Sequence, residues 1–215
     1  MKRVFLVGAA LFIAMVASGC GGGGGGGGTV VTPIFADIPS DLTADAYVAE
    51  NLNTFQLSAP VTGSGAIRVG IDPTIALPAG TEYRGLISFP LGGPGGVPAD
   101  ATIVSATLDI FVDSVQFQFS LPTAIRIDMI EAPPPFASTD YDEVLQPRIG
   151  TSIGFNVVGT GRYLVDITPF MEQAQVPPAL PSLQLRLMLP LTPGANGLIT
   201  INDSAFQPFL TVEYL

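Results

Sequence analysis

Three acidic residues lie close together in the stretch Asp140-Tyr141-Asp142-Glu143, and their carboxylates are the first side chains to consider for chemistry. Two carboxylates are enough for a glycosidase, one acting as the acid and the other as the base or nucleophile. The chain has no histidine and one cysteine, which removes the usual zinc, nucleophile-base and proton-shuttle arrangements. Acidic residues in a proline-flanked loop are more typical of a solvated surface, so we predict that the protein is not an enzyme.

The same three acids are hard oxygen ligands of the kind that calcium prefers. Asp45, or Asn202 and Asp203 in the loop before the last predicted strand, could supply such ligands as well. None of these stretches has the spacing of a known calcium loop, and turn formation and solubility are the simpler explanation for Asp and Asn there. We therefore expect no required cofactor. If an ion binds, it is expected to be calcium, held by Asp140, Asp142 and Glu143.

Aromatic residues in the loop 133–141 suggest a second kind of site. An exposed ring can stack on the apolar face of a sugar while polar groups around it bind the hydroxyls. Phe136 and Tyr141 are the two rings of this loop, and they form the predicted ligand-binding platform. The other four tyrosines fall in strand-like segments and are expected in the core or within a sheet: Tyr47, Tyr83, Tyr163 and Tyr214.

The single cysteine, Cys20, follows the basic pair Lys2-Arg3, a 14-residue apolar run and the small residues Ser18-Gly19. This is the layout of an export signal, and the apolar run is too short to span a bilayer as a helix. Small residues directly before a lone cysteine resemble a bacterial lipobox, which implies that the thiol carries a lipid such as palmitate. We predict a lipoprotein signal peptide over residues 1–19 and lipidation at Cys20.

Eight consecutive glycines, Gly21 to Gly28, follow the cysteine. Glycine has the largest backbone entropy to lose, so we expect a flexible coil of roughly 16 Å root-mean-square length. Residues 20–42 are therefore predicted to be a lipidated tether, and residues 43–215 a single folded domain. Glycine rather than aspartate after the cysteine resembles the outer-membrane sorting signal, which places the protein in the bacterial cell envelope, at the outer membrane.

The charge balance limits the partners. The chain has 8 Lys and Arg, 18 Asp and Glu, and no His. Cleavage at the cysteine would remove Lys2 and Arg3, so the mature chain would keep six arginines, no lysine and all of its acidic residues. Nucleic acid and anionic lipid both require clustered cations, so we predict neither as a ligand. The membrane is expected to be contacted only through the N-terminal lipid.

Beyond residue 43 the hydrophobic pattern has a period of two. Apolar residues alternate with mostly polar ones from Val104 to Val112, which predicts a strand with one buried face. About ten such strands separated by Gly and Pro predict an all-β, single antiparallel β-sandwich. One short helix is expected after Thr168-Pro169, with Thr168 as its N-cap. The other strands are predicted at 45–49, 66–69, 83–89, 115–119, 125–129, 153–158, 162–167, 183–189, 198–201 and 209–214.

The order of these segments resembles the disaggregatase-related domain known as the DNRLRE domain. The resemblance is carried by Tyr83-Arg-Gly-Leu-Ile-Ser-Phe-Pro-Leu91, by Val97-Pro-Ala-Asp-Ala-Thr-Ile-Val-Ser-Ala-Thr-Leu-Asp-Ile-Phe-Val112 and by the closing Gln207-Pro-Phe-Leu-Thr-Val-Glu-Tyr214. It covers nearly all of residues 43–215. It implies a jelly-roll sandwich akin to carbohydrate-binding modules. The chain departs from the family's pattern in having no tryptophan.

Two functions follow as expectations. The first is a non-catalytic, lipid-anchored envelope or cell-surface module that binds polysaccharide or mediates adhesion, as the resemblance implies. The second is a structural or assembly lipoprotein that contacts another envelope protein, which the missing tryptophan and the apolar loop Pro177-Pro-Ala-Leu-Pro181 favour.

Overall fold

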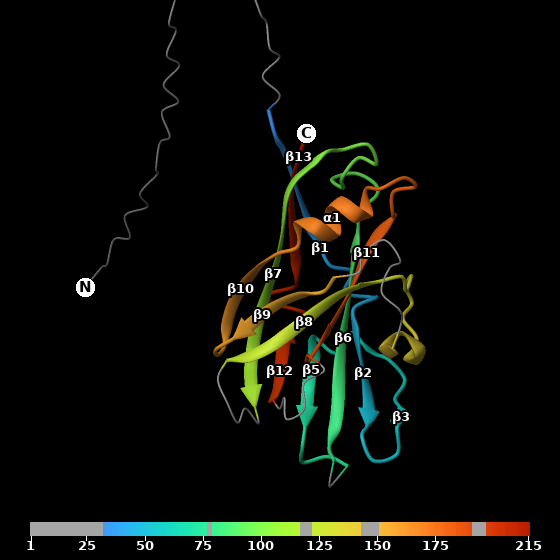
Figure 1. Cartoon of the computed structure of the whole chain (residues 1–215), viewed down its shortest axis with the longest axis vertical. Helices are drawn as coiled ribbons and strands as arrows, with labels where there is room; N and C mark the ends of the chain where they lie inside the picture. Colours follow the sequence, from blue (N-terminus) through green and yellow to red (C-terminus); the bar gives the residue numbers. More distant parts are fainter. Residues whose placement is uncertain (1–31, 77–78, 117–121, 143–150, 191–196) are drawn as a thin grey trace, which may run out of the picture. The chain divides into compact units, whose positions relative to one another are not determined.

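The computed structural model describes residues 32–76, 79–116, 122–142, 151–190 and 197–215. The predicted signal peptide, Cys20 and the glycine tract lie outside these ranges, so their predictions remain untested. Within the described ranges the chain forms thirteen strands, one α-helix and one 3-10 helix (Figure 1). The elements are β1 (Ile34–Pro39), β2 (Ala46–Asn51), β3 (Gln56–Leu57), β4 (Val61–Thr62), β5 (Ala66–Asp72), β6 (Thr81–Pro90), β7 (Ile103–Gln116), β8 (Thr123–Ile130), η1 (Ser138–Asp142), β9 (Ile153–Val157), β10 (Gly161–Asp166), α1 (Thr168–Ala174), β11 (Ser182–Met188), β12 (Gly197–Asn202) and β13 (Phe209–Tyr214).

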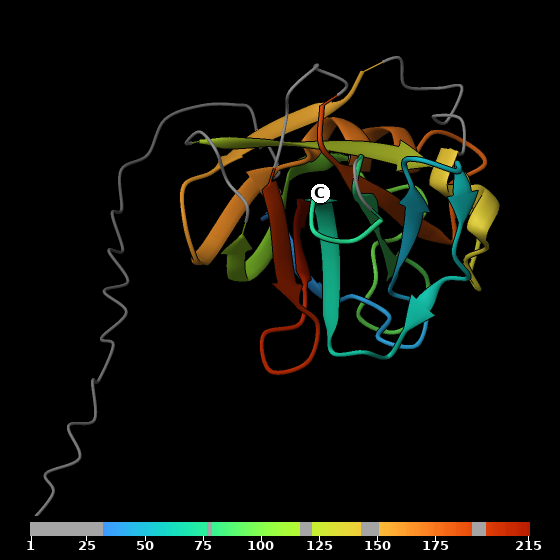
Figure 2. The same ribbon diagram turned by 90° about the horizontal axis from the view of Figure 1, so that it is seen from below.

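The strands form one antiparallel sheet in the order β1-β13-β7-β12-β5-β6-β11-β8-β9, with β10 paired to β7 and β2 paired to β6. Strands from both ends of this order share one hydrophobic core, to which β1 contributes Ile38 and β8 contributes Ile127. The sheet is therefore folded so that its two ends pack against each other across this core. Figure 2 shows β8 and β9 on one side and β5 and β12 on the other. This architecture is the all-β fold that the sequence predicts, and it is consistent with a sandwich.

The longest strand, β7, follows the predicted two-residue repeat from Ala106 to Val112, whereas Val104, expected on the buried face, is exposed near the start of the strand. Leu108 and Ile110 are buried in the core, whereas Asp109 and Phe111 lie on the outer face. One edge of β7 pairs first with β13 and then with β12, and its other edge pairs with β10. Because β12 and β13 follow one another along the same edge, the loop 203–208 between them leaves the sheet next to these outward residues.

The predicted short helix is present as α1 and contacts β7 and β11 (Figure 1). Its N-cap is Ile167 rather than the predicted Thr168, and Pro169 lies in the first turn, where a missing N–H costs nothing. The Thr168 hydroxyl oxygen instead accepts a hydrogen bond from the Ala106 N–H at 2.9 Å, which joins the start of the helix to β7.

The predicted start of the folded domain at residue 43 is wrong. Strand β1 lies within the predicted tether and pairs with β13 along its whole length, from Ile34 opposite Tyr214 to Pro39 opposite Phe209. Its alternate residue Ile38 is buried. The folded unit begins at Thr32. Pro39 ends this strand, and a proline at the end of an edge strand is compatible with the sheet.

Removing β1 should therefore weaken the domain. We expect a fragment of residues 43–215 to lose about 3 kcal/mol of unfolding free energy relative to residues 32–215. The loss arises because Ala36 and Ile38 leave the core and the β13 edge is opened. Urea denaturation of the two fragments measures this difference. Equal midpoints and equal slopes would show that β1 does not contribute to stability.

Candidate functional site

A groove of about 670 Å³ lies on the outer face of β1, β13, β7 and β10, beside the loop 203–208. Its walls are outward-pointing residues that strand pairing brings opposite one another. The paired positions are Asp109 with Phe209, Phe111 with Arg162, and Asp37 with Thr211. The loop adds Ser204 to Gln207. The period-two pattern that buries the core therefore also builds this surface.

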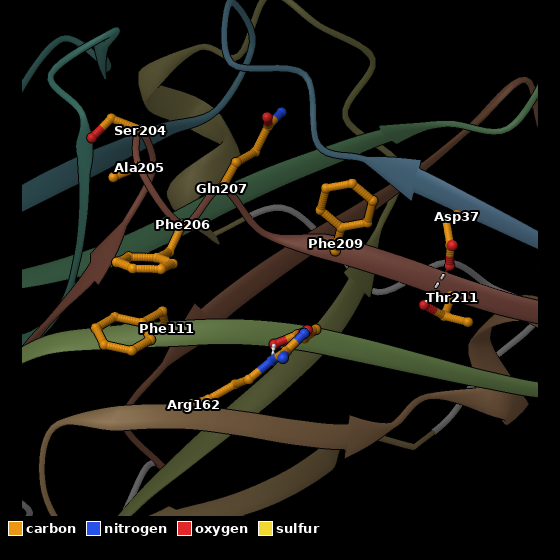
Figure 3. Close-up of a pocket in the computed structure, with 10 residues that line it drawn as sticks. Asp37, Phe111, Arg162, Ser204, Ala205, Phe206, Gln207, Phe209 and Thr211 are labelled. Atoms are coloured by element: carbon orange, nitrogen blue, oxygen red, sulfur yellow. Dashed lines mark hydrogen bonds and ion pairs between the residues drawn. The ribbon is translucent and has the colours of Figure 1, made fainter. Parts of the chain in front are cut away.

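Three phenylalanines form an aromatic surface in the groove. Figure 3 shows the Phe206 ring lying over the Phe111 ring; the two are stacked with centroids 4.6 Å apart and planes inclined by 24°. Phe206 is 57% exposed despite this contact, and Phe209 beside it is partly exposed. Burying such rings in water-free contact with a ligand would be favourable, so they are candidates for a binding platform.

Polar groups flank the aromatic surface. The Arg162 Nε donates to both oxygens of Asp109, at 2.8 and 2.7 Å, and Nη2 also donates to Oδ2 (Figure 3). The Arg162 side chain is 70% exposed, and a guanidinium has five N–H donors, which leaves donors for a ligand. The Thr211 hydroxyl donates to Asp37 Oδ1 at 2.8 Å. These groups could bind hydroxyls while the rings bind an apolar face.

The loop that carries Phe206 is shaped by Asn202 at the end of β12. The Asn202 Oδ1 accepts hydrogen bonds from the backbone N–H groups of Ser204 (3.0 Å) and Phe206 (2.9 Å), and its Nδ2 donates to Asp113 Oδ2 at 2.8 Å. A side-chain oxygen that caps nearby backbone N–H groups is the usual way in which Asn stabilises a turn. Asn202 was an alternative calcium ligand in the sequence, but its oxygen is occupied by the backbone.

The predicted platform of Phe136 and Tyr141 is not an exposed surface. Tyr141 is 0% and Phe136 is 6% exposed, and both belong to a second hydrophobic cluster beside the main core. The Arg84 guanidinium carbon lies 3.8 Å from the centroid of the Tyr141 ring. These two rings hold the 3-10 helix against β2, β6 and β8 rather than forming a site for a ligand. The other four tyrosines lie in strands, as predicted.

The acids of the same segment have protein partners. Asp140 Oδ2 accepts from the Ala137 N–H at 2.7 Å, and Asp142 Oδ1 pairs with Arg84 Nη1 at 2.5 Å. Glu143 lies outside the described residues, so the predicted calcium site at Asp140, Asp142 and Glu143 remains a prediction. In the part of the chain that the structure describes, no group of three or more His, Cys, Asp or Glu side chains is arranged to hold a metal.

Buried charged side chains explain why the segment around Tyr141 packs against the domain. The Tyr141 carbonyl oxygen accepts from Arg84 Nη1 at 2.8 Å and from Arg186 Nη1 at 2.9 Å. Arg186 Nη2 pairs with Asp128 Oδ2 at 2.9 Å, and Arg126 Nε pairs with Asp128 Oδ1 at 2.6 Å. Buried charges must be paired, and this network pairs them while attaching the segment to β6 and β11. No sequence pattern links these residues, which come from four separate segments.

No protein-family model matches the chain, and no curated protein matches it either. Among the described helices, none is both long and apolar enough to cross a membrane.

The buried carboxylate of Asp128 should make the stability of the protein depend on pH. Burial alone would raise its pKa, but hydrogen bonds from Ser152, Arg186 and Arg126 hold the pKa below its usual value. A carboxyl group whose pKa is lower in the folded than in the unfolded protein stabilises the folded state. This stabilisation is complete at pH values above the unfolded-state pKa of about 3.9, and it is lost as the pH falls through the pKa of the folded state. We expect Asp128→Asn to lower the unfolding free energy by about 3 kcal/mol at pH 7.

Urea denaturation between pH 7 and pH 2 measures this effect. The difference in unfolding free energy between wild type and Asp128→Asn should decrease as the pH falls below about 4. Asp100→Asn, which changes an exposed aspartate, is the control and should leave stability nearly unaltered throughout. A difference that stays constant with pH would show that the Asp128 charge does not stabilise the fold.

Proposed function

We propose that the protein is a non-catalytic, lipid-anchored module of the bacterial envelope that binds polysaccharide in the groove between β13, β7 and β10. The observation that carries this proposal is Phe206, a ring that is stacked on Phe111 yet 57% exposed. An aromatic face offers a rigid, apolar surface for the C–H groups of a sugar ring, and it loses little conformational entropy on binding.

The charges of the groove favour a neutral sugar. Asp37, Asp109 and Arg162 are its charged residues, and Arg162 is paired with Asp109. A polyanion would meet an unbalanced Asp37, so its binding would be opposed by like charge. Hydroxyl groups, in contrast, can both donate to the carboxylates and accept from the guanidinium.

The DNRLRE resemblance supports the same function, because such jelly-roll domains are akin to carbohydrate-binding modules. Under this proposal the lipid on Cys20 holds the module at the outer membrane, and the following glycines allow the domain to reach ligand beyond the headgroups.

Binding of the unlipidated mature chain, residues 20–215 with Cys20→Ser, to a panel of neutral and anionic polysaccharides tests the proposal. We expect saturable binding to a neutral polysaccharide and about a tenfold loss of affinity in Phe206→Ala, the equivalent of about 1.4 kcal/mol for one stacking contact. Phe206→Trp should retain binding. Phe55→Ala is the control, because Phe55 is an exposed ring in the turn after β2 and does not line the groove.

The proposal fails if no polysaccharide binds, or if Phe206→Ala and Phe55→Ala bind equally well. Tyr141→Ala is unsuitable as a test because this buried side chain would leave a cavity, and lost binding would then report unfolding.

The proposed lipid anchor on Cys20 can be tested separately. In cells supplied with labelled palmitate, the wild-type protein should take up label and remain with the membranes, whereas Cys20→Ser should take up none. Gly21→Asp should retain the lipid and change the membrane in which the protein is found, because only the residue after the cysteine differs. Label on Cys20→Ser would contradict the assignment of this cysteine.

One observation favours the alternative function, assembly with another envelope protein. In the described structure, β1 ends the strand order and pairs on one side only, and its residues Ile34 and Phe35 are exposed. An open, apolar edge strand can accept a strand from another chain. If no polysaccharide binds, crosslinking from position 35 is the experiment that tests this alternative.

A further inference from the structure

Two carboxyl groups lie together in the interior of the domain, away from the acidic segment around Asp140. Asp45, directly before β2, is 1% exposed, and Asp203, directly after β12, is 5% exposed. They were separate candidates in the sequence, and the fold places them side by side. Ser40, which follows β1 and is 4% exposed, has its hydroxyl group beside the same Asp45 carboxyl group.

Three oxygens of this cluster have no hydrogen-bond partner of ordinary geometry, although the Ser40 hydroxyl and the Asp203 carboxyl group both lie near enough to act on the Asp45 carboxyl group. The three oxygens are Asp45 Oδ2, Asp203 Oδ1 and Ser40 Oγ, all buried. The other oxygen of Asp45, Oδ1, accepts a hydrogen bond from the Ser88 N–H at 2.8 Å. Buried polar atoms normally have well-formed hydrogen bonds, so three neighbouring oxygens without one make this cluster a candidate site for a bound ion.

The backbone holds these three segments in place. The Ser40 N–H donates to the Pro208 carbonyl oxygen at 3.0 Å, and the Asp203 N–H donates to the Gly65 carbonyl oxygen at 3.0 Å. Asp45 is held by a hydrogen bond from its own N–H to the Asp41 carbonyl oxygen at 2.7 Å. These backbone hydrogen bonds therefore fix the positions from which the three side chains meet.

The charges of the pair need compensation. Both carboxyl groups are buried, and no basic side chain acts on either of them. A single shared proton would leave one negative charge in the interior, which is costly when it is unpaired. A divalent cation would neutralise both carboxylates.

We propose that Asp45, Asp203 and Ser40 bind a divalent cation of the calcium type. All three ligands are hard oxygens, which suit calcium and exclude the nitrogen and sulfur sites typical of zinc. Calcium takes six to eight oxygens, so backbone carbonyl groups or water complete its coordination. Asp203 begins the loop that carries Phe206, and the cation would therefore hold that loop on the domain.

Thermal unfolding of residues 20–215 with Cys20→Ser tests this site independently of any sugar. After removal of metal with EDTA, calcium at about 100 times its dissociation constant should raise the melting temperature by about 5–10 °C. Calorimetric titration with calcium chloride should give one site per chain. Sodium chloride at matched ionic strength is the solution control, and a magnesium titration measures selectivity.

Variants locate the ion. Asp203→Asn should abolish the calcium-dependent shift while melting no lower than wild type in EDTA, because it removes a like charge from the buried pair. Asp142→Asn is the matched control and should keep the full shift, since Asp142 belongs to the other acidic segment.

Three results would overturn the proposal. The first is an absence of heat and of any shift when calcium is added to the wild-type protein. The second is a shift that survives Asp203→Asn, which would place the ion elsewhere. The third is a shift that Asp142→Asn removes. Absence of polysaccharide binding would bear only on the proposed function, because these measurements contain no sugar.

Discussion

The two-residue alternation along β7 is the constraint on which the rest of the structure depends. Successive side chains of a strand point to opposite faces, so Leu108 and Ile110 enter the core while Asp109 and Phe111 form the floor of the groove. A slip of one residue against β13 or β10 would exchange the two sets. One register therefore determines both the stability of the domain and the chemistry of its outer face.

The loop between β12 and β13 connects the groove with the interior. Asp203 points into the buried cluster, whereas Phe206, three residues later, stacks on Phe111 in the groove. Asn202 stabilises the turn between these two residues, because its side-chain oxygen accepts hydrogen bonds from the N–H groups of Ser204 and Phe206. A cation bound at Asp203, as proposed, would therefore also act on the position of the exposed ring, because only this short segment separates the two residues.

Much of the fold could be predicted from the sequence, but the site could not. The alternating pattern predicted the longer strands after residue 43 and the short helix at Thr168, because strand and helix periods are local properties of the chain. Strand β1 was missed because six residues next to a glycine tract carry little pattern. The groove rings were missed because Phe206 and Phe209 stand in the closing segment, where apolar residues are expected to be core.

The sequence by itself therefore determined the all-β class and the strongly acidic balance, and it points to an exported, lipidated chain. Only the tertiary structure decided which aromatic rings are exposed and which acids meet. Tyr141 is buried because Arg84 and Arg186, which lie 57 and 45 residues away in the chain, bind its carbonyl oxygen. Asp45 and Asp203 meet because strand pairing brings distant strand ends together. Burial depends on such long-range contacts, whereas periodicity depends only on neighbouring residues.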